Sequence, residues 1–251
     1  MFAVISFDVG VRNLALCRLL CDFSAAELNA DSADEEVLRH IEIQHWELVD
    51  IVTDATTPEL KAKPKAKQVQ PSIPEATSLM LAALRRRELG TPLPGVDATH
   101  VVVEQQPGGK FVNVSMKALS HVIQSFFVLT SPGFPVSFVS AKRKLAGQKK
   151  LPAVAEGEEK RAKGAQYASN KKFALAQARA LLELTRNPDC ARERLARWSK
   201  CDDLCDAFLQ GYQYARSLLP KPPKQNRKRA RSSPSSCVAA KAAKVAKVAF
   251  A

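Results

Sequence analysis

Near its start the chain reads Val4-Ile5-Ser6-Phe7-Asp8-Val9-Gly10, and this stretch decides the fold. It is a largely apolar, β-branched run with one carboxylate near its end and a glycine that closes it, which is typical of a buried strand. An uncompensated carboxylate is costly to bury, so Asp8 needs a cation, a metal ion or hydrogen-bond donors nearby. Other acids in equally apolar surroundings are the first candidates to share such a partner with Asp8.

Two further segments place acids in apolar surroundings. The β-branched run at residues 101–104 ends in Glu104, and the proline and glycines that follow it stop a strand. Residues 201–209 are typical of the start of a helix, in which Asp203 and Asp206 share one face at i and i+3. These acids could converge with Asp8. Clustered carboxylates are stable mainly around a hard divalent cation, and all-oxygen ligands favour magnesium or manganese over zinc.

Each acid also has a purely structural explanation. A carboxylate at a strand end or in the first helical turn is commonly a turn or capping residue, and Asp202 or Asp203 would interact favourably with the helix dipole. Asp202 also stands at i+4 from Asp206 and is an alternative to Asp203 as a ligand. The joint order of two strand acids followed by a helical pair favours the metal site for the set.

The three segments together resemble the RuvC-type Holliday junction resolvases, in particular the branch of poxviruses, related large DNA viruses and fungal mitochondria. The matching residues are Phe7-Asp8-Val9-Gly10-Val11-Arg12-Asn13, Val103-Glu104-Gln105-Gln106 and Lys200-Cys201-Asp202-Asp203-Leu204-Cys205-Asp206-Ala207-Phe208. The resemblance implies an α/β, RNase H-like fold with a five-stranded mixed sheet flanked by helices. It also implies an endonuclease that cuts four-way DNA junctions, with Asp8, Glu104, Asp203 and Asp206 as the catalytic metal ligands.

The expected reaction is phosphodiester hydrolysis with two metal ions per active site, Mg²⁺ with Mn²⁺ able to substitute. Paired symmetric nicks need two active sites, so a homodimer on branched DNA is expected. Polar and basic residues near the acids or in basic runs are expected to contact the DNA backbone: Arg12, Asn13, Gln105, Gln106, Lys110, Asn113, Lys117, Lys142, Arg143 and Lys144. Turn formation explains Asn13 equally well, and Asn113 is also a natural helix cap.

Hydrophobic periodicity predicts the elements of the fold. Strands are expected at 2–9, 14–20, 41–52, 101–104 and 135–139, and helices at 75–89, 113–129, 172–184 and 201–219. Residues 22–39 are acidic and polar and are predicted to form a surface loop, and Asn187-Pro188 is predicted to end the third helix. The resulting division is a resolvase domain at 1–220, with a flexible insertion at 54–74 and a basic arm at 142–172, followed by a disordered tail at 221–251.

Charge points to a polyanionic partner. The formal net charge is +13 and the pI is about 9.6. Residues 221–251 hold nine Lys or Arg and no acid, which leaves +4 for the rest. The run 224–231 resembles a nuclear-localisation signal, although a DNA tether would look the same. Without a long apolar run or a leader-like start, a soluble intracellular protein is expected, in the nucleus or at a viral replication site rather than in the mitochondrion.

The six cysteines lack the spacing of a zinc site, because both close pairs are C-x₃-C. Reduced, mostly buried thiols are expected. Two other functions stay open alongside the resolvase. One is an RNase H-like nuclease that acts on RNA–DNA hybrids or flaps, and the other is a noncatalytic DNA-binding protein.

Overall fold

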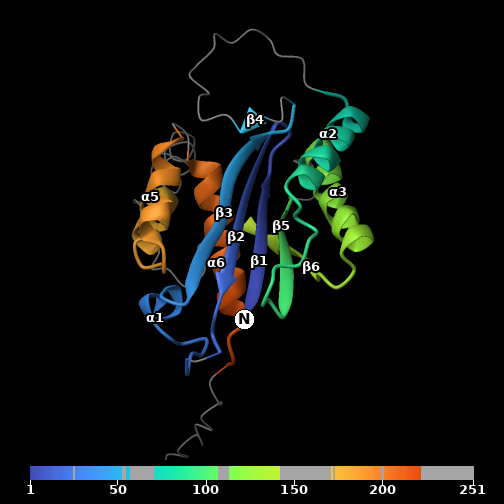
Figure 1. Cartoon of the computed structure of the whole chain (residues 1–251). Coiled ribbons are helices and arrows are strands. Elements are labelled where there is room, and N and C mark those ends of the chain that lie inside the picture. The colour runs from blue at the N-terminus through green and yellow to red at the C-terminus, as the bar shows by residue number, and fades with distance from the viewer. Residues whose placement is uncertain are drawn as a thin grey trace, which may run out of the picture. The chain divides into compact units, whose positions relative to one another are not determined.

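The computed structural model describes residues 1–24, 26–52, 55–56, 71–106, 113–141, 171, 173–198 and 201–221 (Figure 1). Within it, Met1–Lys221 forms one compact unit. Most of the predicted insertion at 54–74, nearly all of the predicted basic arm at 142–172 and the predicted tail, apart from Lys221, lie outside the described residues.

A mixed sheet in the strand order β4-β3-β2-β1-β5-β6 forms the centre of the fold. The strands are β1 (Phe2–Val9), β2 (Asn13–Cys21), β3 (Ile41–Asp50), β4 (Ala55–Thr56), β5 (Ala98–Gln105) and β6 (Val136–Ser140). The pairs β1–β2, β2–β3 and β3–β4 are antiparallel, whereas β1–β5 and β5–β6 are parallel. The five predicted strands are therefore confirmed, and the two-residue β4 extends the sheet at one edge.

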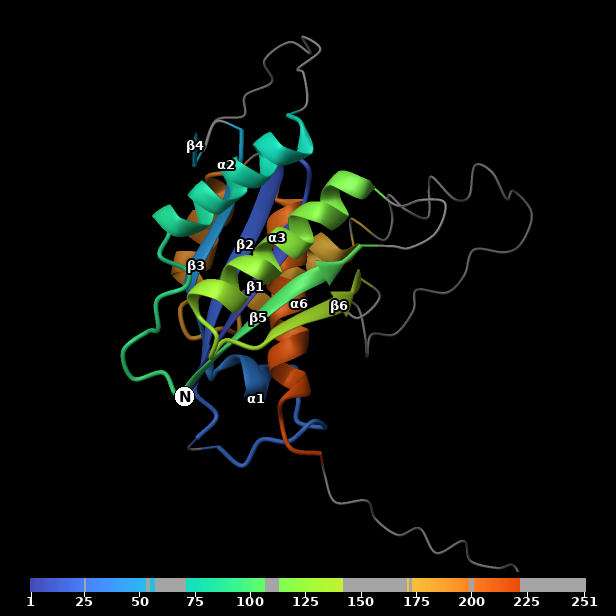
Figure 2. The same cartoon turned by 90° about the vertical axis from the view of Figure 1, so that its right-hand side faces the viewer.

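The helices cover both faces of this sheet. They are α1 (Asp34–Leu38), α2 (Ile73–Arg86), α3 (Val114–Thr130), a helix at 173–182, α5 (Pro188–Ala196) and α6 (Asp202–Ser217). Figure 2 shows α2 and α3 in front of the sheet and α6 behind it. Asn113 caps α3, since its Oδ1 accepts a hydrogen bond from the Met116 amide at 3.2 Å. None of the helices in the described part of the chain combines the apolar character and the length that a bilayer span needs.

Side-chain alternation along the strands produces one apolar core on each face of the sheet. Ile5, Phe7 and Val103 belong to the core beneath α2 and α3. Val4 and Val102 point the other way and pack in the core beneath α6. The central strands are thus buried on both sides, which explains their nearly continuous apolar sequence.

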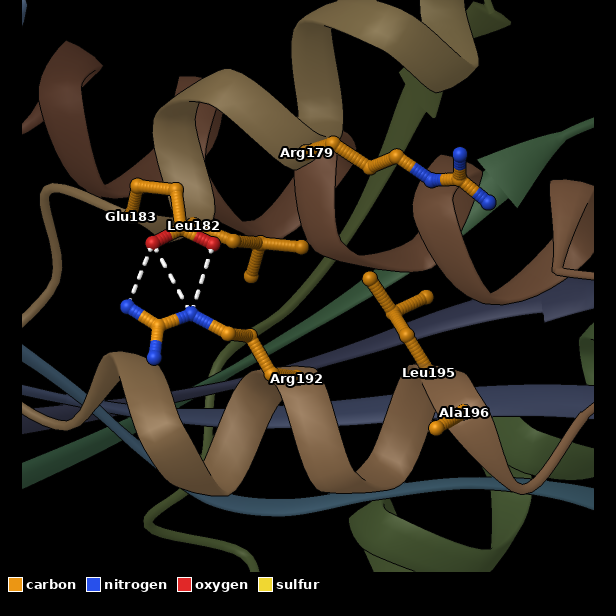
Figure 3. Close-up of a pocket in the computed structure, with 6 residues that line it drawn as sticks. All are labelled: Arg179, Leu182, Glu183, Arg192, Leu195 and Ala196. Atoms are coloured by element: carbon orange, nitrogen blue, oxygen red, sulfur yellow. Dashed lines mark hydrogen bonds and ion pairs between the residues drawn. The ribbon is translucent and has the colours of Figure 1, made fainter.

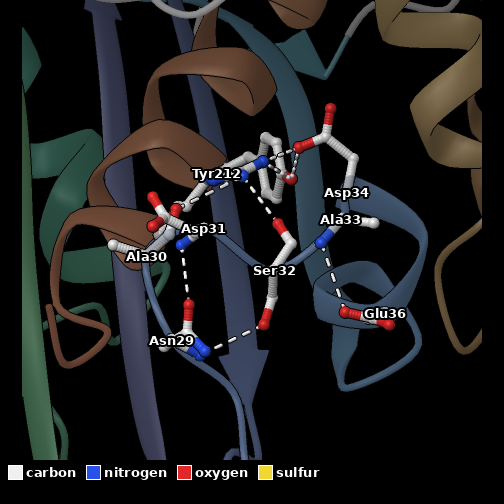
Figure 4. Close-up of polar contacts among 9 residues, drawn as sticks. Asn29, Ala30, Asp31, Ser32, Ala33, Asp34, Glu36 and Tyr212 are labelled. Atoms are coloured by element: carbon white, nitrogen blue, oxygen red, sulfur yellow. Dashed lines mark hydrogen bonds and ion pairs between the residues drawn. The ribbon is translucent and has the colours of Figure 1, made fainter. Parts of the chain in front are cut away.

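The prediction of a surface loop at 22–39 was wrong at its end, where α1 buries Val37 and Leu38. The segment's acidity suggested exposure, but acids in the first turn of a helix interact favourably with its dipole. The end of α6 holds this region in place, because Asp34 accepts hydrogen bonds from Tyr212 and Arg216 (Figure 4). Arg216 Nη2 also donates to the Ser32 carbonyl at 2.7 Å.

The sequence predicted that a helix ends at Asn187-Pro188. The structure shows that another helix, α5, begins at Pro188. Pro188 is the first residue of α5, where its missing amide hydrogen costs nothing because that position has no intrahelical acceptor. Asn187 joins the new helix to the sheet, since its side chain accepts from the Ile43 amide at 3.0 Å and donates to the Ile43 carbonyl at 3.1 Å.

Candidate active site at the carboxyl ends of β1 and β5

Asp8 and Glu104 are neighbours in the sheet. The parallel register pairs Phe7 of β1 with Val103 of β5, and each acid is the next residue on its strand. Phe7 and Val103 face α2 and α3, so alternation directs Asp8 and Glu104 to the opposite face, where α6 packs. Both acids are partly buried.

The helix α6 runs antiparallel to these two strands. Gln210 Nε2 donates to Ser6 Oγ and to the Phe7 carbonyl, both at 3.1 Å. One turn later, the Tyr214 hydroxyl lies 3.3 Å from His100 Nδ1, near the beginning of β5. Later residues of α6 therefore contact earlier residues of the strands. It follows that the first turns of α6 lie toward the carboxyl ends of β1 and β5.

This direction brings the helical acids to the level of the strand acids. Asp206 precedes Gln210 by four residues, a rise of about 6 Å along the helix. Asp8 follows Ser6 by two residues, which is a similar length of about 6.6 Å along a strand. Asp203 lies nearly one turn further toward the start of α6. The backbone thus brings all four predicted acids to one end of the sheet.

Asp203 and Asp202 point in different directions around the axis of α6. Around the helix axis, Asp203 lies about 20° from Gln210, which faces the strands, whereas Asp202 lies about 80° away. Asp202 forms an ion pair with Lys171. The placement therefore favours Asp203, together with Asp206, as the acid directed at Asp8 and Glu104.

The donor set suits a hard divalent cation by its chemistry, because it consists of carboxylates from three elements at one end of the sheet. Within the described residues, no three Asp, Glu, His or Cys side chains are gathered closely enough to count as a metal cluster. Each of the four acids takes part in another polar or electrostatic interaction. The residues thus fit a metal ion by chemistry and by backbone position, and side-chain movement would have to complete a coordination shell.

The β1–β2 turn next to Asp8 contains Arg12 and Asn13. The Gly10 amide donates to the Asn13 carbonyl at 2.9 Å, which closes the predicted hairpin. Arg12 is engaged by Asp50, to which it donates two hydrogen bonds at 2.8 and 2.7 Å. Asn13 Oδ1 is buried and has no hydrogen-bond partner among the described residues. Contact of Arg12 and Asn13 with DNA stays a prediction.

The other predicted DNA contacts divide into two groups. Gln105 and Gln106 end or follow β5 directly beyond Glu104, and Asn113 and Lys117 are exposed at the start of α3. Outside the described residues lie the remaining four: Lys110, Lys142, Arg143 and Lys144.

Sequence analysis missed Gln210 and Gly211. Gln210 is 2% exposed, and a Cβ on Gly211 would lie 3.1 Å from Ser6 Cβ and 3.2 Å from Leu19 Cδ1. These two residues allow α6 to lie close against β1 and β2. The available signal was a polar residue and a glycine on a helix face that is otherwise apolar.

Four of the five cysteines within the described residues are part of the core. Cys17, Cys21, Cys201 and Cys205 are free and buried. Burial raises the pKa of the Cys205 thiol to about 12 and raises the pKa of Cys17 and Cys21 as well. These thiols therefore stay protonated near neutral pH, and their burial agrees with the prediction of mostly buried thiols.

A separate pocket of about 250 Å³ lies between the helix at 173–182 and α5 (Figure 3). Its lining residues are Arg179, Leu182, Glu183, Arg192, Leu195 and Ala196. Arg192 Nε donates to both carboxylate oxygens of Glu183 at 3.0 Å, so much of the charge in the pocket is internally paired. None of the four predicted acids lines it.

The chain resembles one known protein family and several solved structures. Residues 4–107 match the family model described as mitochondrial resolvase Ydc2 and RNA splicing MRS1, a range that includes Asp8 and Glu104 and ends before α6. The fowlpox virus resolvase, solved with its Holliday junction DNA substrate, aligns with a TM-score of 0.50 at 17% identity, covering 87% of this chain and 99% of that one. This likeness confirms the predicted fold.

Two other solved structures are similar at lower scores. Thermus thermophilus RuvC aligns with a TM-score of 0.44 at 14% identity, covering 88% of this chain and all of that chain (100%). The yeast mitochondrial Holliday junction resolvase Ydc2 aligns with a TM-score of 0.39 at 11% identity, covering 85% and 77% of the two chains. No curated protein matches the chain.

Proposed function

We propose that this chain, which carries the Ydc2/MRS1 family match and the fold of the fowlpox virus resolvase, is a RuvC-type Holliday junction resolvase. The observation that carries the proposal is the register of β1 and β5, which makes Asp8 and Glu104 neighbours at the strand ends that face the start of α6. A helix with two further acids, Asp203 and Asp206, completes an arrangement suited to hydrolysis of a phosphodiester.

The four acids are the proposed ligands of divalent metal, namely two Mg²⁺ ions, for which Mn²⁺ can substitute. Bound metal would supply Lewis acidity and a water of lowered pKa. The chain's own contribution is to hold several carboxylates at one end of the sheet, where their mutual repulsion favours a cation. Neither a histidine nor a lysine is required as general base.

Branched DNA is the proposed substrate, cut by paired symmetric nicks. The net charge of +13 favours a polyanion, and Gln105 at the end of β5 and Asn113 and Lys117 at the start of α3 are exposed polar or basic groups. These groups suit contacts to phosphates and sugars, so selectivity would come from the shape of the junction. A homodimer would supply the second active site.

The test is cleavage of a labelled four-way junction, with and without Mg²⁺, by the full chain and by Asp8→Asn. Asp31→Asn is the matched control, because Asp31 is exposed in the loop before α1. Metal-dependent paired nicks that vanish in Asp8→Asn and persist in Asp31→Asn support the proposal. Tight junction binding without cleavage in Mg²⁺ or Mn²⁺ overturns it.

A second candidate is a noncatalytic nucleic-acid-binding protein, favoured by the family description, which names an RNA splicing protein beside the resolvase. Such a protein would bind its nucleic acid equally well when Asp8 is neutralised. A third candidate, a nuclease for RNA–DNA hybrids or flaps, keeps the same acids and changes the substrate. Competition among a junction, a hybrid and a plain duplex separates the two nucleases, and the absence of any Asp8-dependent cleavage identifies the noncatalytic protein.

The location in the cell also needs a direct test. The basic run 224–231, on which the nuclear expectation rests, lies outside the described residues. The family description names a mitochondrial resolvase, which favours the mitochondrion over the nucleus or a viral replication site. Imaging fluorescent fusions with and without residues 222–251 distinguishes these locations.

A further inference from the structure

One buried amide joins the three elements that carry the acids. Gln210 on α6 donates from Nε2 to Ser6 Oγ and the Phe7 carbonyl of β1, both at 3.1 Å, and to the Val102 carbonyl of β5 at 3.5 Å. The side chain is 2% exposed. A fully buried amide that serves three acceptors has one orientation, since a flip would turn its oxygen toward two carbonyls.

The residues joined by these hydrogen bonds lie close in sequence to the predicted acids. Phe7 directly precedes Asp8, Val102 is two residues before Glu104, and Gln210 is about one turn after Asp206. The amide is therefore placed where a small shift of α6 against β1 would change the separation of the strand acids from the helical acids.

Strand pairing does not set the separation between the strand acids and the helical acids, because α6 is not part of the sheet. The pairing of β1 with β5 ends at Phe7 and Val103, one residue before the two acids. The close approach of α6 to β1 depends instead on Gly211, where a Cβ would meet Ser6 Cβ at 3.1 Å, and on the amide of Gln210 beside it. Gly211 permits the approach, and the hydrogen bonds of Gln210 hold it in register.

We propose that Gln210 is a positioning residue for the four acids: it holds the start of α6, with Asp203 and Asp206, at the level of Asp8 and Glu104, so that their side chains can close around a shared divalent cation. This inference rests on the proposed metal site. Gln210 acts through the four acids and touches neither substrate nor metal. Groups that orient metal ligands in this way typically contribute 10- to 100-fold to metal affinity or activity, which sets the scale of the expected effect.

If the Gln210 amide only stabilises the fold, its removal should leave metal binding and cleavage unchanged. Replacing one partner of buried hydrogen bonds with an apolar group costs stability whether or not the amide positions the acids, so stability alone does not distinguish the two roles. The Gln210→Met variant keeps the length of the side chain and removes its donors. Under a structural role it would bind metal and cut DNA like the wild type once corrected for the folded fraction.

The experiment compares Gln210→Met with Gln213→Met, which alters the next glutamine along α6. The readouts are Mn²⁺ binding by calorimetry, the Mg²⁺ concentration for half-maximal junction cleavage, and junction affinity in EDTA. For Gln210→Met we expect Mn²⁺ affinity to fall by about 10- to 100-fold and the Mg²⁺ requirement to rise in parallel, with junction affinity within about twofold of wild type. Gln213→Met should match the wild type in all three.

Ser6→Ala provides a milder test that removes one of the three acceptors, in case Gln210→Met does not fold. We expect it to weaken Mn²⁺ binding severalfold. Unchanged Mn²⁺ affinity and Mg²⁺ requirement in folded Gln210→Met, or in folded Ser6→Ala where Gln210→Met does not fold, overturn the positioning role. A wild type that binds Mn²⁺ but cuts no junction defeats the proposed nuclease and leaves the positioning role to be decided by the Mn²⁺ affinities. A wild type that binds no Mn²⁺ defeats both.

Discussion

Arg12 donates both of its side-chain hydrogen bonds to a single carboxylate oxygen, Oδ2 of Asp50, at 2.8 and 2.7 Å. The other oxygen of Asp50 accepts the Val52 amide at 3.0 Å. Asp50 is 3% exposed at the end of β3, whereas Arg12 lies in the turn after β1. This pair ties the turn that follows Asp8 to the neighbouring strand, so it stabilises the end of the sheet where the acids lie.

Arg12→Met should destabilise the fold by about 2 kcal/mol, because it removes two charged hydrogen bonds to the buried carboxylate of Asp50. Chemical denaturation measures the change in the free energy of unfolding. The control is Arg39→Met, which breaks an ion pair with Glu35 in which both side chains are exposed, and which should cost less than about 1 kcal/mol. Equal losses in the two variants would contradict a structural role for the Arg12–Asp50 pair.

Gly211→Leu should destabilise the protein by about 3 kcal/mol, because any side chain at this position meets Ser6 and Leu19 at once. Gly211→Ala should cost much less, since the gain in helix propensity of about 1 kcal/mol offsets part of the crowding. Thermal and urea unfolding of both variants check this order. A Leu variant as stable as the Ala variant would show that α6 can move away from β1 without loss.

Asp203→Asn should reduce junction cleavage by at least about 100-fold, as expected for loss of a metal ligand, whereas Asp202→Asn should stay within a few-fold of wild type. The reason is that Asp203 shares the strand-facing side of α6 with Gln210, and Asp202 is paired with Lys171. Single-turnover cleavage in saturating Mg²⁺ makes the comparison. The reverse order of the two losses would assign Asp202 as the ligand.

Acid should destabilise the protein partly through Glu47. Burial opposes ionisation of this side chain, but hydrogen bonds and charge from His45 and Arg87 outweigh that effect and lower the pKa of Glu47 below 4.5. A carboxyl group with a lowered folded-state pKa stabilises the fold above its unfolded pKa, and this stability is lost as the pH falls through the folded value. The free energy of unfolding should therefore fall less steeply below about pH 4.5 in Glu47→Gln than in the wild type. An unchanged slope would exclude Glu47, and exposed Glu27→Gln provides the control.

The exposed apolar residues of α3 are the predicted contact between two copies of the chain. Val128 and Leu129, adjacent near the end of α3, are 56% and 81% exposed, and neighbouring exposed apolar groups are a feature of interfaces. Leu129→Lys should shift a dimer to monomer in analytical ultracentrifugation. Leu218→Lys, at a 41% exposed residue at the end of α6, should leave the oligomeric state unchanged. A Leu129→Lys dimer as stable as the wild type would exclude this part of α3 as the interface.

Local patterns in the sequence predicted the sheet well. The run around Asp8 and the run ending in Glu104 are apolar on both faces, so their burial follows from composition alone. Helix starts were harder to predict. Acids and proline are common in loops, but they are also common in the first turn of a helix, as in α1 and α5. Both elements were missed for that reason.

The amino-acid sequence by itself identified the four acids as candidates for the chemistry, because a carboxylate in an apolar strand is recognisable wherever the strand lies. Only the tertiary structure decided that the segments carrying those acids lie at one end of the sheet. The register of β1 with β5 and the antiparallel placement of α6, held by Gln210 and allowed by Gly211, depend on contacts between residues about 100 to 200 positions apart. Such contacts leave no periodic signal in the chain, since the energy that selects them comes from packing and hydrogen bonds formed only after the elements have come together.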